Sequence, residues 1–352
     1  MDPIVDTAEL PKSPEFSLDK ASIVEKLHKR IASSKPADVL CLDVDGTVYT
    51  KEQKSEGTWT KIGNNEKASE QLKQKSIPHI LVSGRPDWNN ESDEEMQKLG
   101  LSKADVIICA AGRTIYWRNT AGELVLDRKF QDMMNNQAIT YTTEDGKRIE
   151  TNFDAFKIRD LVNQQVQKNP IKGIEQVKVD NPNDPKSAFT TLDVNNMSFD
   201  KLQEVIRGIR TSISGVKVEF SEDLERVSEN TFSGWIQIVP QKGGKDGSLR
   251  YILETIAKKI NPYNEPHKNP VASVVGDGSI DIWMLAMGQG DKDPYNLKQF
   301  GLGNLTPHAR AKLEKVVGAL SNKREDGMRR AHLQIIEQKG DNGVLQVINF
   351  LQ

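Results

Sequence analysis

The segment that most constrains this chain is residues 43–47, with the sequence DVDGT, which directly follows an apolar run at residues 39–42. A short apolar run that ends in a glycine-containing turn predicts a buried strand of a parallel sheet. In open α/β sheets, ligands bind at the carboxyl ends of the strands. We therefore expect Asp43 and Asp45 to place two carboxyl groups beside one pocket.

The residue types in this segment are suited to phosphoryl transfer. A carboxylate can act as a nucleophile that accepts a phosphoryl group, and a neighbouring aspartate can carry protons. A hard cation such as Mg²⁺ prefers carboxylate and carbonyl oxygens. Gly46 allows a sharp turn beside an anion, and the Thr47 hydroxyl can donate a hydrogen bond. The segment is also typical of an ordinary strand end followed by an Asp-Gly turn, so its meaning depends on the rest of the chain.

Two further apolar runs predict neighbouring strands of the same sheet. Residues 77–82 form one run, which ends in Ser83, Gly84 and Arg85. A hydroxyl, a glycine and a cation at a strand end suit phosphate binding. Residues 106–111 form the other run. Helical patterns separate the three strands, so right-handed crossovers would assemble them into a parallel sheet.

The pattern changes at Arg113. Residues 115–118 and 123–127 flank a turn with the sequence NTAG, which predicts a β-hairpin. Because antiparallel strands are not expected inside a parallel sheet, we assign residues 113–239 to an inserted α+β domain. The polar, glycine-containing residues 51–65 predict a loop.

The first pattern resumes after Pro240. Residues 241–247, QKGGKDG, form a glycine-rich loop that leads into a predicted helix, and a lysine at such a junction can neutralise a phosphate. The apolar run at residues 271–275 then ends in a second carboxylate pair, Asp277 and Asp281. Asp281 also suits a helix N-terminal cap.

Size and composition exclude several classes of protein. A chain of 352 residues suits two domains. Its formal net charge of -2 gives no electrostatic reason to expect nucleic acid or a membrane surface as partner. Cys41 and Cys109 lie inside apolar runs, so we expect reduced core thiols. Residues 1–20 are polar, which predicts a disordered leader and, with no apolar stretch near the ~20 residues of a membrane span, a cytoplasmic protein. The oligomeric state stays open.

Taken together, the strand-end motifs DxDGT, SGR, Lys and GDxxxD resemble, in their order and spacing, the haloacid dehalogenase superfamily of phosphohydrolases. The long segment between Ser83 and Lys245 is similar to the cap of the sugar-phosphatase branch, and residues 110–116, AAGRTIY, resemble the cap entry of sucrose-phosphate phosphatase and Cof-type relatives. The resemblance begins near Val39 and is strong in the core and weak in the cap.

The resemblance implies a fold and a division into domains. The expected architecture is α/β, with a Rossmann-like parallel-sheet core and an inserted α+β cap domain. The core would comprise residues 21–112 and 240–352, and the cap residues 113–239. Arg113, Trp117 and Trp235 lie near the junctions and are candidates for substrate contact by that nearness alone.

The resemblance also implies roles for individual residues. Asp43 becomes the nucleophile that forms an aspartyl phosphate, and Asp45 the acid that protonates the leaving oxygen and later activates water. The phosphoryl oxygens would be bound by a set of loop residues: Thr47, Ser83, Gly84 and Lys245. Lys242 is the alternative lysine, but Lys245 lies just before the helix, where the family places it.

Mg²⁺ is the implied cofactor. Its implied ligands are the carboxylate of Asp43, the main-chain carbonyl of Asp45, and Asp277, with Asp281 either ligating or orienting. The chain departs from many relatives at Ile280, where they have asparagine, which leaves contacts at that position open.

These inferences favour a Mg²⁺-dependent phosphatase that acts on a small phosphorylated metabolite, a sugar phosphate such as sucrose phosphate, with the inserted domain as a lid. Two alternatives stay open. A phosphosugar mutase would use the same aspartyl phosphate but return the phosphoryl group, and a non-catalytic binding protein could retain the fold alone.

Overall fold

The computed structural model describes most of the chain: residues 22–27, 29–30, 39–53, 59–85, 87–143, 145–168, 172–179, 189–222, 231–260, 271–278, 281–287, 296–303, 305, 309–310, 312–315 and 331–351. The leader expected at residues 1–20 lies outside this part.

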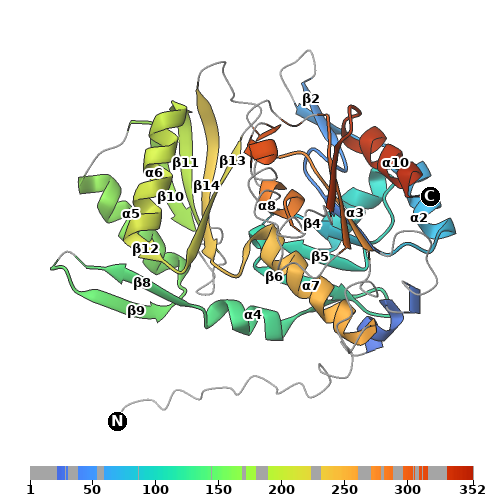
Figure 1. Cartoon of the computed structure of the whole chain (residues 1–352), viewed down its shortest axis with the longest axis horizontal. Helices are drawn as coiled ribbons and strands as arrows, with labels where there is room; N and C mark the ends of the chain where they lie inside the picture. Colours follow the sequence, from blue (N-terminus) through green and yellow to red (C-terminus); the bar gives the residue numbers. More distant parts are fainter. Residues whose placement is uncertain are drawn as a thin grey trace, which may run out of the picture.

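The larger part of the molecule is built on an eight-stranded sheet with the order β17-β16-β15-β1-β4-β5-β6-β7 (Figure 1). Its strands are β1 (Val39–Asp43), β4 (His79–Val82), β5 (Val106–Cys109), β6 (Thr114–Arg118), β7 (Leu124–Leu126), β15 (Val271–Gly276), β16 (Asn296–Gly301) and β17 (Ala331–Ile335). The six strands from β17 to β5 run parallel to one another. We call this sheet with its helices the core; it has the expected α/β architecture.

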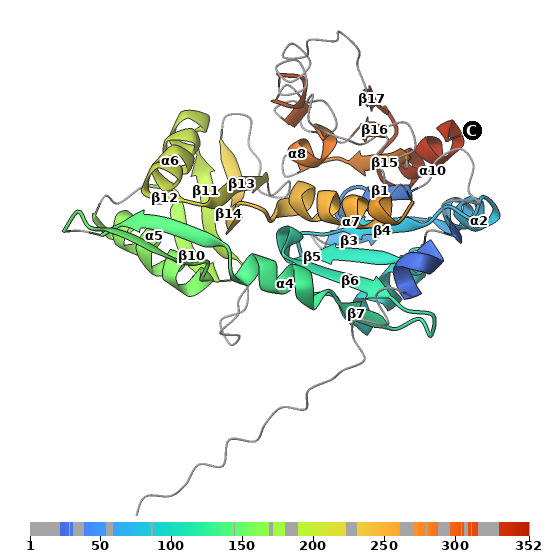
Figure 2. The same cartoon turned by 60° about the horizontal axis from the view of Figure 1, so that its bottom comes forward.

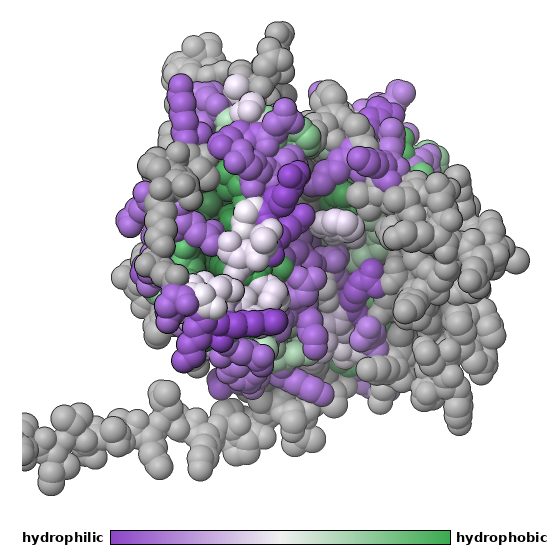
Figure 3. All heavy atoms as spheres, turned by 60° about the vertical axis from the view of Figure 1, so that its left-hand side comes forward, coloured by the Kyte–Doolittle hydropathy of each residue, from purple (hydrophilic) through white to green (hydrophobic). Residues whose placement is uncertain are grey.

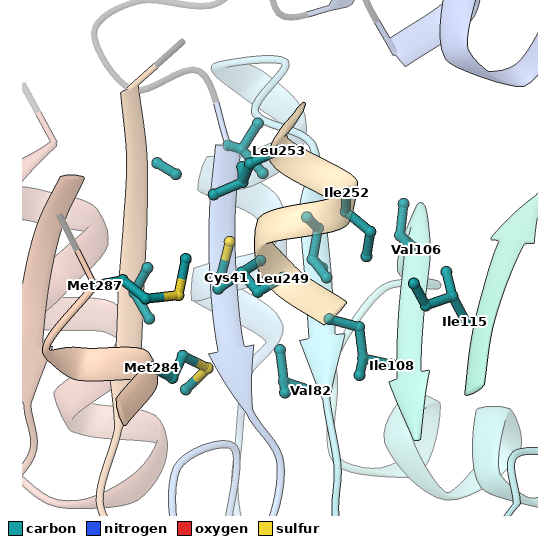
Figure 4. Close-up of a cluster of buried hydrophobic side chains, with 14 of the residues drawn as sticks. Cys41, Val82, Val106, Ile108, Ile115, Leu249, Ile252, Leu253, Met284 and Met287 are labelled. Carbon is teal, nitrogen blue, oxygen red and sulfur yellow. The ribbon is translucent and has the colours of Figure 1, made fainter. Parts of the chain in front are cut away.

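Helices cover both faces of the core sheet. The helices on one face are α7 (Gly244–Ile260) and α8 (Ile282–Leu285), and those on the other are α2 (Glu66–Gln74), α3 (Asn90–Lys98) and α10 (Gly340–Phe350). Figure 4 shows that Leu249, Ile252 and Leu253 of α7 pack on the inner strands, in the same cluster as Cys41 and Val82. The inner strands β1, β4, β5 and β15 are buried on both faces, which is why their sequences are largely apolar.

Both cysteines are buried and neither belongs to a disulfide, as expected for core thiols. Cys41 lies in β1 and Cys109 ends β5, and the two side chains belong to hydrophobic clusters on opposite faces of the sheet. Burial raises the pKa of the Cys41 thiol above its usual range, which keeps it protonated.

The predicted hairpin forms, but its assignment to the inserted domain is wrong. β6 pairs antiparallel with β5, and β7 pairs with β6, so the hairpin extends the core sheet. The reason is the 3-10 turn Ala110–Gly112, which reverses the chain directly after β5. The next helix, α4 (Arg128–Asn135), also packs on the core through Phe130 and Met134. Figure 2 shows α4 leading from the core to the remaining elements.

Residues 51–65 also differ from the expected loop. They contain a two-stranded antiparallel ribbon of β2 (Thr50–Gln53) and β3 (Trp59–Ile62). A ribbon of this kind is held by main-chain hydrogen bonds, and its polar sequence carries no period-two alternation that could distinguish it from a loop.

The elements that follow α4 form separate sheets, and we call residues 138–240 the insertion. A four-stranded antiparallel sheet has the order β10-β11-β14-β13, and a smaller sheet has the order β12-β8-β9. Their strands are β8 (Ala138–Thr142), β9 (Arg148–Asn152), β10 (Ile174–Val179), β11 (Thr190–Met197), β12 (Ile213–Ser214), β13 (Val216–Glu222) and β14 (Phe232–Pro240). This α+β arrangement, completed by two helices, is the expected one.

The four-stranded sheet lies between the core and the helices α5 (Ala155–Lys168) and α6 (Phe199–Ser212) (Figure 1). Leu202, Val205, Ile206 and Ile209 of α6 form the stripe that packs on the sheet. The side of the molecule that carries the insertion is predominantly hydrophilic where its atoms are coloured (Figure 3). The face of the sheet that does not carry α5 and α6 is turned to the core (Figure 1).

Gly112 brings two distant segments into contact. Its φ is +86°, and a Cβ atom there would lie 2.0 Å from the carbonyl oxygen of Gly244 at the start of α7. The Ser248 hydroxyl donates to the carbonyls of both glycines, at 2.8 and 2.6 Å. This close approach fixes the first turn of α7 against the end of β5.

We expect Gly112→Ala to lower the free energy of unfolding by at least ~3 kcal/mol, because a left-handed backbone and a steric clash add up. Gly122→Ala is the matched control: its φ is +87°, but a Cβ atom would meet nothing within 4 Å. The control should cost only ~1–2 kcal/mol. Denaturant unfolding measures both, and equal losses would contradict the importance of the contact.

Candidate active site

Three strand ends meet where the chain passes from one half of the core sheet to the other. β1 pairs in parallel with β15 on one side and with β4 on the other. Asp43 ends β1, Asp277 follows β15, and Ser83 follows β4. Because the two halves of the sheet extend in opposite directions from β1, this is the topological switch point at which open α/β sheets bind ligands.

Three of the predicted site residues form a buried carboxylate cluster. One carboxylate oxygen each from Asp43, Asp277 and Asp281 lie within 4.8 Å of one another. The three residues are 3%, 5% and 0% exposed. The sequence pairs Asp277 with Asp281 four residues apart, and the fold brings Asp43 to them from another strand.

Lys245 is the buried cation of this cluster. Its Nζ donates to the carboxylate of Asp43 and, at 2.7 Å, to Oδ1 of Asp281. Lys245 lies in the first turn of α7, whose position depends on the Gly112 contact. The alternative lysine, Lys242, is exposed. The structure therefore places Lys245 at Asp43, where the sequence preferred it.

Main-chain groups hold Asp281 in place. Its Oδ2 accepts hydrogen bonds from the main-chain N–H groups of Asp277 and Gly278, at 3.2 and 3.0 Å. Asp281 occupies the position before α8, but its side chain does not cap that helix. The alternative that Asp281 serves as a side-chain cap of the helix is therefore wrong, because the carboxylate turns back to the strand end and to Lys245.

Gly46 makes the approach of the two strand ends possible. Its φ is +90°, and a Cβ atom at this position would lie 2.0 Å from Oδ2 of Asp277. The hydroxyl of Thr47 donates to Oδ1 of Asp277 at 2.9 Å. Thr47, which the resemblance places at the substrate phosphate, thus also orients a carboxylate of the cluster.

The charges of the cluster do not balance within the protein. Burial, and next the charge of Asp281, raise the pKa of Asp43 well above its usual value, and the same two causes raise the pKa of Asp277. The raised pKa values show that the protein holds these carboxylates ionised only at a cost, since the cation that bonds to the cluster is Lys245, at Asp43 and Asp281. A hard divalent cation with oxygen ligands would neutralise them, so this donor set fits Mg²⁺.

Asp45 lies apart from this cluster in its side-chain contacts. Its side chain is 48% exposed, accepts a hydrogen bond from the Tyr49 hydroxyl, and approaches Arg85. The described carboxylates that could hold a metal are therefore Asp43, Asp277 and Asp281. Any contribution of Asp45 would come from its main-chain carbonyl, as the resemblance implies.

The second motif divides into two parts. Ser83 is fully buried at the end of β4, and its hydroxyl accepts a hydrogen bond from the N–H of Arg85 at 3.1 Å. Gly84 has open space where a side chain would be. The guanidinium of Arg85, a candidate phosphate ligand from its residue type, instead donates to Glu95 at 2.6 Å.

The three candidates for substrate contact at the domain junctions, Arg113, Trp117 and Trp235, have different surroundings in the structure. Trp117 is buried in the core and donates to Asp127 at 2.9 Å, and Arg113 lies over the ring of Phe153 at 4.8 Å. Only Trp235, in β14, lies on the strand face that is turned to the core, as described below. Ile280 lies outside the described residues.

A family model described as haloacid dehalogenase-like hydrolase matches residues 40–289, which include all four motifs. The chain belongs to this family. Its membership confirms the resemblance drawn from the strand-end motifs, and it identifies the protein as a hydrolase.

One solved structure with a TM-score above 0.5 supports the fold of this hydrolase, and two others are similar at lower scores. Sucrose-phosphatase from Synechocystis, solved with sucrose and phosphate, is 15% identical with a TM-score of 0.52, over 89% of this chain and 97% of that one. A haloacid dehalogenase-like hydrolase from Bacillus subtilis is 16% identical with a TM-score of 0.45, over 93% and 99% of the two chains. A trehalose-6-phosphate phosphatase domain from C. albicans is 14% identical with a TM-score of 0.44, over 93% and 96%.

A comparison with curated protein sequences finds no match. Within the part of the chain that the structure describes, no helix has the length and apolar character that crossing a bilayer requires.

The charge imbalance of the cluster predicts that Mg²⁺ stabilises the folded protein. Saturating Mg²⁺ should raise the free energy of unfolding by about 2–4 kcal/mol over a chelator control, because the ion binds the folded state alone. Asp277→Asn should remove most of this gain. Asp127→Asn removes an equally buried carboxylate that caps α4, and it should keep the gain. A gain that Asp277→Asn leaves unchanged would place the ion elsewhere.

Proposed function

We propose that this hydrolase is a Mg²⁺-dependent phosphatase that acts on the phosphate monoester of a small sugar, such as sucrose phosphate, through an aspartyl-phosphate intermediate. The proposal combines a nucleophilic carboxylate, a buried cation and an acid-base residue at one switch point. Hydrolysis of phosphate monoesters is among the slowest uncatalysed reactions, so several such groups must act together.

In the proposed reaction, Asp43 attacks phosphorus and the bond from phosphorus to the sugar oxygen breaks. Asp45 gives its proton to the departing oxygen. A water molecule then attacks the aspartyl phosphate, its proton passes to Asp45, and inorganic phosphate leaves. Lys245 and Ser83 are the proposed donors to the phosphoryl oxygens, with the main chain of Gly84 close by.

In this proposal Asp43, Asp277 and Asp281, with the Asp45 carbonyl, would hold the metal ion. When bound, Mg²⁺ supplies the positive charge that lets a phosphate dianion approach buried carboxylates. Thr47 contributes indirectly, because its hydroxyl orients Asp277.

The observation that carries the choice of a sugar is a pair of buried acceptors in the insertion. Glu219 of β13 lies opposite Gln237 of β14, and the two residues are 6% and 8% exposed. Among the described residues, both carboxylate oxygens of Glu219 and Oε1 of Gln237 have no hydrogen-bond partner. Unpaired buried acceptors are costly, so they favour binding of a ligand that offers donors. Sugar hydroxyl groups are such donors, whereas phosphate oxygens are not.

These acceptors lie on the face of the sheet that is turned to the core. Val218 and Ile238, their neighbours in sequence, point into the cluster beneath α5 and α6, so Glu219 and Gln237 point the opposite way. Val239, on the same side as Gln237, packs against Ala110 and Ala111 of the core.

Lys217 ties this face to the start of α7. It shares the face of Glu219, and its Nζ donates to Oδ1 of Asp246 at 2.6 Å and to the Gly243 carbonyl at 3.0 Å. Asp246 is the neighbour of Lys245 in the chain. These contacts of Lys217 support the proposal that the insertion acts as a lid whose acceptors select the sugar.

The first test measures phosphate release from a panel of sugar phosphates and nucleotides, with Mg²⁺ and with chelator. We expect selective, Mg²⁺-dependent release from a sugar phosphate and a loss of at least ~10³-fold in Asp43→Asn, because the nucleophile is removed. Asp127→Asn is the control for loss of a buried carboxylate. Isomerised sugar phosphate without free phosphate would favour a mutase, and no reaction with any substrate would favour the binding-protein alternative.

The second test uses the pH dependence of stability. Burial raises the pKa of Glu219 from 4.5 to about 7. The folded state then binds a proton that the unfolded state has lost, so wild-type stability falls as pH rises from about 4.5 through about 7. Glu219→Gln should be more stable than wild type by up to about 3 kcal/mol at pH 8, with little difference at pH 4. The exposed Glu150→Gln should follow wild type, and a pH-independent difference would contradict the unpaired carboxylate.

A further inference from the structure

Asp45 differs from the other carboxylates of the site in how it is held. Asp43, Asp277 and Asp281 are fixed by burial, whereas the side chain of Asp45 is 48% exposed. A half-exposed aspartate ordinarily samples several rotamers, yet an acid-base group must hold one orientation toward the leaving oxygen. Some other feature must therefore orient it.

Both carboxylate oxygens of Asp45 have a partner. The hydroxyl of Tyr49 donates to Oδ1, and Nε of Arg85 lies 3.7 Å from Oδ2. The two partners are joined to each other, because Nη2 of Arg85 donates to the Tyr49 hydroxyl at 3.1 Å. The three side chains thus form a closed triangle of polar contacts.

The two partners are themselves immobilised. Tyr49 is fully buried, and its main chain forms a β-bridge with Asp45. Nη1 of Arg85 donates to Glu95 of α3 at 2.6 Å, and its guanidinium lies 5.6 Å from the ring of Trp88. The triangle is therefore anchored to the hydrophobic core on one side and to α3 on the other.

No neighbouring described group competes with Asp45 for the proton of the Tyr49 hydroxyl. Lys61 Nζ lies 4.9 Å from the centre of the Tyr49 ring and contacts Glu95, so it approaches the ring rather than the hydroxyl. A tyrosine side chain is protonated at neutral pH. Its single proton is directed at Asp45, which leaves that carboxylate one fixed orientation.

We propose that Tyr49 and Arg85 are positioning residues, which hold the carboxylate of Asp45 in the orientation that proton transfer to the leaving oxygen requires. The inference rests on the proposed phosphatase function and adds two residues to it. Neither residue is expected to touch the phosphoryl group.

The test compares phenyl phosphate with p-nitrophenyl phosphate, which differ by a para nitro group and therefore in how much the leaving oxygen needs a proton. Phenolate is a poor leaving group that needs the acid, whereas p-nitrophenolate can leave without it. In Tyr49→Phe we expect kcat/KM for phenyl phosphate to fall about tenfold and that for p-nitrophenyl phosphate to change less than about twofold. Arg85→Lys, which keeps the charge but loses the guanidinium fork, should show the same difference between substrates.

Two controls isolate the effect. Tyr251 lies in α7, and its hydroxyl is 3.5 Å from Asp127 at the start of α4. Tyr251→Phe removes this phenol and should leave both rates unchanged. In an Asp45→Asn background, Tyr49→Phe should have no further effect, because the residue it positions is gone.

Each other outcome overturns the inference. Equal losses with both substrates would mean that Tyr49 acts on the structure of the site as a whole, and a gain in either rate would mean that it restrains Asp45 unproductively. A wild-type protein that hydrolyses neither aryl ester nor any sugar phosphate with Mg²⁺ would overturn the proposed phosphatase and this inference together, whereas an active wild type whose two rates are unchanged in Tyr49→Phe would overturn this inference alone.

Discussion

The concentration of negative charge at the centre of the core sheet is the constraint on which the rest of the structure depends. Asp43, Asp277 and Asp281 are buried within 4.8 Å of one another, and Lys245 is the cation that bonds to two of them. Removing one partner from a buried ionic group leaves charge without compensation and destabilises a fold strongly. The fold must therefore bring Lys245 to the carboxylates from a distant segment. Lys245 lies in the first turn of α7, and the close approach of Gly112 to Gly244 positions that turn.

The position of Lys245 also determines where the insertion lies. β14 ends at Pro240, five residues before Lys245, so the four-stranded sheet is connected directly to the loop that carries the cation. The contact of Val239 with Ala110 and Ala111 seats the sheet on the turn after β5. The turn Ala110–Gly112 therefore supports both the proposed catalytic residues and the proposed sugar-binding face.

The sequence predicted the core well because its signals are local. Apolar runs bounded by glycine-containing turns indicated the parallel strands, and polar residues at their ends indicated the site. The position of Lys245 before a helix distinguished it from Lys242. Two predictions failed for one reason. The hairpin of β6 and β7 was predicted but assigned to the wrong sheet, and the ribbon of β2 and β3 was predicted to be a loop. In both cases the outcome depends on the partner strand, which local sequence does not specify.

The sequence by itself determined the order of motifs, the α/β class and the family, because each follows from residue types at fixed spacings. The tertiary structure alone decided the surroundings of those residues. Tyr49 meets Arg85 from another strand end, and the alternation that places Glu219 on a polar face is the same whether that face meets solvent or the core. Only the folded structure shows that, among the described residues, the Glu219 carboxylate and Oε1 of Gln237 are buried with no hydrogen-bond partner.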